Sequence, residues 1–189
     1  MKYRALLLAS LLCLKVTAAE FRGLWVDSWS PGLFDAAQIS QLVNDARAGH
    51  FNALIVEVRR RGDAFYNSSF EPKNASLAPD FDPLADLLAK AHNTNDGPRL
   101  AVHCWIVTYP VWTAGAAPPQ PDHPLNLHPE WRNQTYHGLF TDGHAYYFDP
   151  GHPEVQQHTF NVAMDIITRY DVDGLNWDHC CPTGLRVEG

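Results

Sequence analysis

The sequence has little of what marks several common classes of protein. Its 189 residues include two methionines and four cysteines, and 21 acidic residues outnumber 14 Lys and Arg, for a formal net charge of −7. This balance offers no basic surface to nucleic acid, and the scattered acids argue against an anionic membrane as a partner. Beyond residue 19 no apolar stretch is long enough to span a bilayer. We therefore expect neither nucleic acid nor a membrane as a partner of the mature chain.

The sequence has too few cysteines for disulfides to hold the fold together. Only Cys104, Cys180 and Cys181 remain after the first 19 residues, with no Cys-x-x-Cys pair among them. Adjacent cysteines have poor geometry for bridging each other, so we predict no framework of structural disulfides. We also predict no metal site, and nothing in the sequence calls for a cofactor.

The first 19 residues have the pattern of a signal peptide. Lys2 and Arg4 precede an apolar run over 5–14, and small residues at 17–19 stand before Glu20. The run is too short for a membrane span. The alternative is an N-terminal core helix. We expect cleavage near Glu20, a secreted or periplasmic location and one domain over 20–189. Three glycosylation sequons begin at Asn67, Asn74 and Asn133.

Strand and helix patterns alternate along the mature chain. Apolar runs predict strands over 21–29, 53–58, 100–107 and 172–177. Helix starts are indicated at Asp35 with Gln38 as a capping-box partner, at Asp82-Pro83, and at Pro153. The stretch 109–149, rich in Pro, His and aromatic residues, is predicted to be an irregular, functional loop.

Four strands joined by helices predict an α/β fold with a parallel sheet. One candidate is the N-terminal half of a (β/α)₈ TIM barrel, truncated after the fourth strand. The other is an open, doubly wound sheet. Since no Gly-rich phosphate loop follows the first strand, nucleotide binding on an open sheet loses its usual support, and we favour the half barrel.

Polar and aromatic residues gather at the predicted strand ends, where a parallel barrel builds its active site. Side chains two positions apart in a strand point the same way, so pairs of them can face one cavity. Asp178 has the strongest case for a catalytic role, because an unpaired carboxylate behind an apolar run is costly. The candidates for substrate binding are Trp25, Asp27, Arg59, Asp63, Tyr66, His103, Trp105 and Asn176.

Several of these residues also have a purely structural interpretation. Glu57 and Arg59 could form a buried ion pair across strands. His103 could be a core histidine, Asp63 could cap a turn after Gly62, and the tryptophans of the strands could be packing residues. Asp173, at the start of the last strand, is interpreted as structural.

Five segments resemble one known family in order and spacing. They are RGLWVDSW (22–29), FNALIVEVRRRGDAFYNSSFEP (51–72), VHCWIV (102–107), FDPGHPEV (148–155) and RYDVDGLNWDH (169–179). The chain resembles the N-terminal half of the glycosyl-hydrolase-like family 10, exported TIM-barrel proteins. The resemblance implies a carbohydrate-active enzyme. It matches onto the family's motifs Arg59, Asp63, Tyr66, His103, Trp105, Asp149, Asp173 and Asp178.

Glycoside hydrolysis usually needs two carboxyl groups that flank the bond. Asp178 is the candidate general acid/base, acting on a poly- or oligosaccharide, while Glu57 and Asp63 are the nearby substitutes for its partner. One alternative is an inactive fragment. The other is a non-catalytic carbohydrate-binding or surface-interaction module whose stacking platforms are Trp25, Trp105, Tyr109, Trp112 and Trp131.

Overall fold

The molecule is built around a parallel sheet of four strands. The structure is a computed structural model that describes residues 20–180, so the predicted signal peptide and Cys181 lie outside the described residues. The strands are β1 (Gly23–Val26), β2 (Ala53–Arg59), β3 (Ala101–Val107) and β6 (Gly174–Asp178). They lie side by side in the order β1-β2-β3-β6 and all run parallel. All four predicted strands therefore form, the first of them shorter than expected.

The helix α1 (Ala36–Ala48) begins where the sequence predicts, because Asp35 caps it. The Asp35 carboxylate accepts hydrogen bonds from two backbone N–H groups of the first turn. The hydrogen bonds of Gln38 differ from those of a regular capping box. Its amide nitrogen donates to the Asp35 carboxylate at 2.9 Å, and its oxygen accepts from the backbone N–H of Gly32 at 2.8 Å. The side chain thus holds the loop that enters the helix.

The two other predicted helices also start as expected. The Asp82 carboxylate accepts a hydrogen bond from the backbone N–H of Ala85, at 3.1 Å, at the start of α2 (Pro83–Ala91). Pro153 is the first residue of α4 (Pro153–Arg169). Proline is favoured at this position because a backbone N–H in the first turn of a helix has no acceptor within the helix. The absence of that N–H in proline therefore costs no hydrogen bond.

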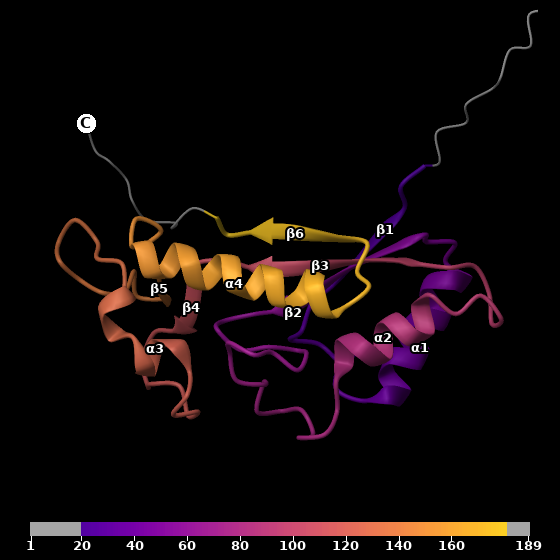
Figure 1. Cartoon of the computed structure of the whole chain (residues 1–189), viewed down its shortest axis with the longest axis horizontal. Coiled ribbons are helices and arrows are strands. Elements are labelled where there is room, and N and C mark those ends of the chain that lie inside the picture. Colours follow the sequence, from indigo (N-terminus) through magenta and orange to yellow (C-terminus); the bar gives the residue numbers. More distant parts are fainter. Residues whose placement is uncertain (1–19, 181–189) are drawn as a thin grey trace, which may run out of the picture.

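All three long helices pack on one face of the sheet. The main core joins side chains of alternate positions in β2 and β3 to side chains of α1, α2 and α4. Its members include Leu54, Val56, Val58, Val102, Cys104, Ile106, Ile39, Val43, Leu84, Leu87 and Ile166. Since the strands follow one another in sequence order with helices on a single face (Figure 1), the sheet is not doubly wound.

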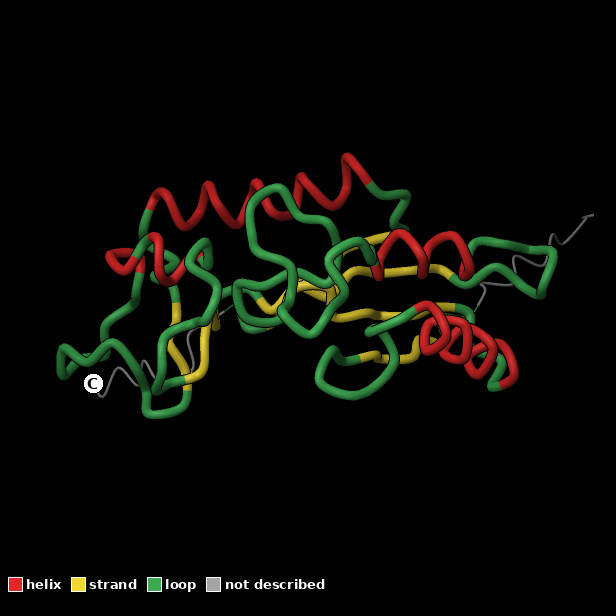
Figure 2. Tube along the Cα trace, turned by 90° about the horizontal axis from the view of Figure 1, so that it is seen from below, coloured by secondary structure: helices red, strands yellow, loops and turns green. Residues whose placement is uncertain are grey.

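The stretch predicted to be an irregular loop is a small folded insertion between β3 and α4. It contains β4 (Pro110–Thr113), α3 (Pro124–Leu127), the 3₁₀ helix η1 (Pro129–Trp131) and β5 (Ala145–Tyr147), with β4 and β5 antiparallel. The prediction of an irregular loop was wrong because a second core supports these short elements: Val111, Leu125, Trp131, Phe148 and Val155. Figures 1 and 2 show that the insertion projects beyond the carboxyl ends of the parallel strands.

A buried histidine fixes this insertion to the end of β2. The Nε2–H of His123 donates to the carbonyl oxygen of Arg61 at 2.8 Å, and Nδ1 accepts from the backbone N–H of Leu125 at 3.2 Å. Gly62, at φ +71°, passes so close that a Cβ there would lie 2.9 Å from the imidazole. Burial lowers the pKa of His123 despite its bond to the Arg61 carbonyl, which favours the neutral ring that this pairing needs.

Candidate functional site

The face of the sheet opposite the helices carries five of the predicted site residues. Parallel register places Glu57 beside Trp105 and Trp105 beside Asn176. One pleat earlier, Trp25 lies beside Ile55, which lies beside His103. Partners in register point to the same side of a sheet, and residues two apart in a strand share a face. The structure therefore brings five candidates to one face: Trp25, His103, Trp105, Asn176 and Asp178.

Asp178 is the last residue of β6, at the carboxyl end of the strand. The indole N–H of Trp105 donates to its Oδ2 at 3.0 Å, and the backbone N–H of His179 donates to Oδ1 at 2.7 Å. The side chain keeps 39 % of its surface exposed. The donors fix the orientation of a carboxylate that solvent, or a substrate, still reaches.

The residue that follows Asp178 has an unusual backbone. His179 adopts φ +51°, in the left-handed region that side chains other than glycine rarely occupy. Its imidazole Nε2 lies 3.8 Å from Oδ2 of Asp178. Such conformations cluster at functional sites, because surrounding structure must maintain them. The imidazole of His179 therefore stands next to the carboxylate, beyond hydrogen-bond distance.

Aromatic rings continue from Trp105 across the open face, toward the amino ends of the strands. Trp25 packs edge-on against Trp105 with 5.1 Å between ring centroids, and 55 % of Trp25 is exposed. Phe21 packs edge-on against His103 at 5.6 Å. Gly174 makes room for that imidazole, since a Cβ there would lie 2.5 Å from its Nδ1. Exposed indole surface beside a carboxylate offers a sugar ring a stacking surface and a hydrogen-bond acceptor.

Two further carboxylates at the strand ends already have partners. Oε2 of the buried Glu57 accepts from the backbone N–H of Ser28 at 2.8 Å and from its hydroxyl at 2.5 Å. Burial raises the pKa of Glu57, against the opposing effect of these bonds. Asp27 accepts from the backbone N–H groups of Trp29 and Ser30, each at 2.7 Å. Burial would raise the pKa of Asp27, but these hydrogen bonds lower it.

Arg59 lies on the helix side of the sheet, because the register shifts after Glu57. Glu57 pairs with Trp105 but Arg59 pairs with Ile106, so three residues of β2 pass two of β3. The guanidinium donates to both oxygens of Glu71, at 2.7 and 2.6 Å. The expected buried ion pair thus exists with a different acid, and the expectation that Glu57 and Arg59 share a face was wrong.

Asp63 and Tyr66 are also buried, within the loop that follows β2. The Asn74 amide donates to Asp63 Oδ2 at 2.5 Å, and Arg60 lies 3.8 Å from the same oxygen. Tyr66 packs edge-on against Tyr170 at 5.7 Å. The side-chain amide of Asn74 is buried in its hydrogen bond with Asp63, so this sequon is closed to a glycan in the folded chain. Neither Asp63 nor Tyr66 reaches the open face.

The other aromatic residues proposed as stacking platforms of a binding module belong to the second core and not to the open face of the sheet. Trp131 is buried in the second core and donates its indole N–H to Glu154 at 2.9 Å. Trp112 and Tyr109 are half-buried against that core. Asp173 is structural, as expected, since it accepts from the Val102 N–H at 2.7 Å. Trp25 and Trp105 remain as platforms on the open sheet face.

Sequence reasoning missed three residues that shape this site. Ser28 holds Glu57, Phe21 extends the aromatic surface, and Glu71 neutralises Arg59. Alternation along the first strand would have placed Phe21 on the face of Trp25, but nothing local marks Ser28 or Glu71 as partners. Their contacts span 29 and 12 residues of sequence and depend on the folded loops.

The described part of the chain contains neither a cluster of side chains that could hold a metal ion nor a helix that could cross a membrane. No group of three or more His, Cys, Asp or Glu side chains is arranged to hold a metal ion among residues 20–180. None of the helices described there is long and apolar enough to cross a bilayer. Cys104 is buried and Cys180 exposed, both as free thiols.

The fold of the chain resembles that of two solved structures, one of them a carbohydrate-active enzyme. A noncanonic maltogenic α-amylase, AmyB from Thermotoga neapolitana, superposes with a TM-score of 0.54 at 13 % identity, over 84 % of this chain and 39 % of that one. A hypothetical protein from Ruminiclostridium thermocellum superposes with a TM-score of 0.57 at 14 % identity, over 82 % of this chain and 75 % of that one. At these identities the likeness concerns the fold alone.

Sequence comparison gives relatives with a common name. Glycosyl hydrolase YngK of Bacillus subtilis is 27 % identical over 84 % of this chain and 32 % of its own length. Glycosyl hydrolase DigH of Escherichia coli is 27 % identical over 75 % and 33 %. The chain thus spans about a third of the length of these curated relatives. The sequence model of one family matches residues 20–184, so the chain belongs to the glycosyl hydrolase-like 10 family.

Proposed function

We propose that this chain is exported and forms the first half of a (β/α)₈ glycoside hydrolase barrel that binds a poly- or oligosaccharide at its strand ends. Asp178 would serve as general acid/base, while Trp25 and Trp105 stack on sugar rings, and His103 and Asn176 supply hydrogen bonds. The observation that carries the proposal is the 3.0 Å bond from the Trp105 indole to Asp178, at the carboxyl end of a parallel strand.

The half barrel is supported by how the sheet is covered. Strands in sequence order, with the long helices of residues 20–180 on one face, are the arrangement expected of a barrel wall, whose other face would line the barrel interior. Here that other face carries exposed aromatic rings, Trp25 and Phe21. On the helix face of β6, 43 % of Trp177 is exposed. Large apolar surfaces of this kind are normally covered by further structure.

A carbohydrate-binding role without catalysis is the second candidate. It is favoured by one specific observation, which is that the other strand-end carboxylates, Asp27 and Glu57, are engaged by backbone or hydroxyl donors. Hydrolysis would then need a carboxyl group from elsewhere. Both candidates share the same sugar-binding face, so binding is tested first.

Replacing Trp105 by Ala should weaken oligosaccharide binding by the full chain by about 1 kcal/mol, roughly fivefold, because a stacking surface is lost. Calorimetric titration with a panel of neutral oligosaccharides measures this effect. Trp105→Phe keeps a ring but loses the donor to Asp178, and should have an intermediate effect.

The matched control is Trp177→Ala, one residue before Asp178. This tryptophan pairs in register with Ile106 on the helix face, and 43 % of it is exposed. Its loss should leave sugar affinity unchanged. Equal affinities for the parent and Trp105→Ala would assign Trp105 to packing alone and contradict the proposed site.

The proposed export also predicts at which residue the mature protein begins. The charged start, apolar run and small residues before Glu20 lead us to expect that the exported protein begins at or near Glu20. N-terminal sequencing of the protein recovered outside the cytoplasm checks this. Recovery of the protein with Met1 intact in the cytoplasm would contradict it.

A further inference from the structure

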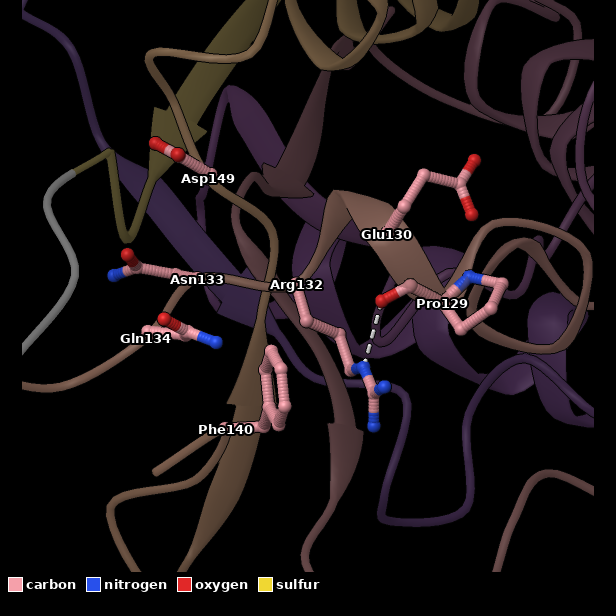
Figure 3. A pocket seen from close by; sticks show the side chains of 7 residues that line it. All are labelled: Pro129, Glu130, Arg132, Asn133, Gln134, Phe140 and Asp149. Carbon is pink, nitrogen blue, oxygen red and sulfur yellow. Dashed lines mark hydrogen bonds between the residues drawn. The ribbon is translucent and has the colours of Figure 1, made fainter. Parts of the chain in front are cut away.

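The insertion between β3 and α4 carries a cleft that the proposed catalytic site does not use. Its volume is about 660 Å³, within the range of small-molecule sites. Figure 3 shows side chains from η1 and from the chain on either side of β5 around it. The lining residues are Pro129, Glu130, Arg132, Asn133, Gln134, Phe140 and Asp149.

Two neighbouring side-chain amides give the cleft its hydrogen-bonding capacity. Asn133 and Gln134 each carry two N–H donors and one carbonyl acceptor. Among residues 20–180 neither side chain makes a hydrogen bond to the rest of the folded chain. Figure 3 places both amides on the same side of the cleft as the Asp149 carboxylate. Donors and acceptors that lie together suit the alternating hydroxyl groups of a sugar.

A partly exposed aromatic ring adds an apolar surface. Phe140 is 37 % exposed, and the guanidinium of Arg132 lies 4.2 Å from its ring centroid. Arg132 is itself held, since its Nε–H donates to the carbonyl oxygen of Pro129 at 2.7 Å. The ring therefore stands in a fixed position, with its remaining surface available to the C–H face of a sugar.

The charges of the lining restrict the kind of sugar. One guanidinium, from Arg132, stands against two carboxylates, from Glu130 and Asp149, which leaves a formal charge of −1. Asp149 is positioned by the backbone N–H of Gly151, which donates to its Oδ1 at 2.8 Å. An acidic sugar would be repelled by this set, whereas an uncharged one is accepted.

The cleft adjoins the strand ends through the backbone. The N–H of Phe148 donates to the carbonyl oxygen of Tyr109, and the N–H of Thr108 donates to that of Asp178, both at 2.9 Å. Successive residues of the segment after β3 thus connect the edge of the cleft with the predicted catalytic carboxylate. The insertion that carries the cleft is therefore anchored at the same end of the sheet as Asp178, and a glycan of several units is the kind of ligand that would contact both.

We infer that this cleft is a second carbohydrate-binding site, which holds an uncharged sugar unit of the glycan bound at the strand ends. The inference rests on the proposed function and extends it. Phe140 supplies the stacking surface, Asn133 and Gln134 bind hydroxyl groups, and Asp149 accepts a hydrogen bond from the same unit.

The test uses the full chain with cello-, malto- and chitohexaose as uncharged probes, and a hexamer of galacturonic acid as the charged one. Phe140→Ala should weaken the tightest uncharged hexaose about fivefold to tenfold in calorimetry. Tyr136→Ala is the matched control, because this aromatic residue of the same loop is 92 % exposed and does not line the cleft. The side-chain NH₂ signals of Asn133 and Gln134 should shift in NMR spectra when the hexaose is added.

The outcomes separate this inference from the proposed function. Unchanged affinity in Phe140→Ala with unshifted amide signals, beside a loss in Trp105→Ala, overturns the cleft and keeps the strand-end site. A loss in Phe140→Ala alone supports a sugar site in the insertion and contradicts the strand-end proposal. Tighter binding of the galacturonic acid hexamer than of every uncharged hexaose overturns the assignment to an uncharged sugar.

Discussion

Replacing Glu71 by Gln should lower the free energy of unfolding by about 3–5 kcal/mol, because it leaves the buried Arg59 guanidinium without a counter-charge. Arg59 and Glu71 are both buried and share two hydrogen bonds of 2.7 and 2.6 Å. Arg59 also donates to the carbonyl oxygens of Val107 and Thr108, at the end of β3. The pair thus ties the loop after β2 to the site end of the sheet.

Urea unfolding followed by circular dichroism measures this loss. Asp86→Asn is the control, because it breaks the partly exposed pair with Lys90 one turn along α2, and such pairs are worth at most about 1 kcal/mol. A loss of similar size in both variants would contradict the role given to Glu71. Since domains are stable by only about 5–15 kcal/mol, Glu71→Gln should also raise the fraction unfolded at equilibrium.

The same pair predicts how stability depends on pH. Burial would raise the pKa of Glu71, but Arg59 outweighs it and lowers the pKa to about 2, from an ordinary value of 4.5. Hydrogen bonds from Arg59 and His158 act in the same direction. A lowered carboxyl pKa stabilises the fold above pH 4.5, and the contribution is lost as the pH falls toward 2. Between these values the stability of Glu71→Gln should vary less steeply than that of the parent.

Local sequence was sufficient to predict where the three long helices begin and that the sheet is parallel. Asp35 and Asp82 cap helices through bonds to residues two or three positions ahead, so the caps depend on nothing distant. The parallel sheet followed from strand and helix patterns in alternation, because parallel neighbours require crossovers. Asp178 at a strand end and its neighbours on the open face followed from the period of two along a strand.

The position of Arg59 could not be predicted in this way. Alternation within β2 places it beside Glu57, but the strand bulges against β3 and reverses its side. The register of a strand depends on its partner, and the partner here begins more than forty residues later. The acid that neutralises Arg59 comes from the loop after β2, where no periodic pattern marks which side chain turns inward.

The insertion was mistaken for an irregular loop for a related reason. Its strands have three or four residues and pair across more than thirty positions, so neither shows a clear period. What holds them is the cluster around Trp131, with His128 stacked on the indole at 3.8 Å, and the buried His123. The aromatic residues that looked like platforms for sugars are partly the core of this unit.

Hydrolysis should not occur in the described sheet alone, because the other carboxyl group on the strands of this face, Glu57, is separated from Asp178 by the side chain of Trp105. Glu57 is on the same face but two strands away and one pleat lower, roughly 12 Å between Cα atoms from standard sheet spacings. The side chain of Trp105 lies on the strand between them and is bonded to Asp178.

The chemical state of Glu57 points the same way. Burial raises the pKa of Glu57, and its Oε2 already accepts two hydrogen bonds from Ser28. A nucleophile or general base must be free to approach the substrate. Glu57 therefore holds the end of β1 in place, and under the half-barrel proposal the catalytic partner of Asp178 would come from outside the described strands.

We accordingly expect the full chain to bind oligosaccharides but to hydrolyse a panel of aryl glycosides no faster than its Asp178→Asn variant. Light scattering on the same sample should give a mass above the 21.2 kDa of one chain, because the open face and the helix flank near β6 leave Phe21, Trp25 and Phe160 more than half exposed. A monomer whose turnover falls 10²-fold or more in Asp178→Asn would overturn the half-barrel proposal, since general acid–base catalysis of that size requires a complete site. Glu57→Gln would then be the next variant, because Glu57 is the carboxyl group on the same face of the described sheet.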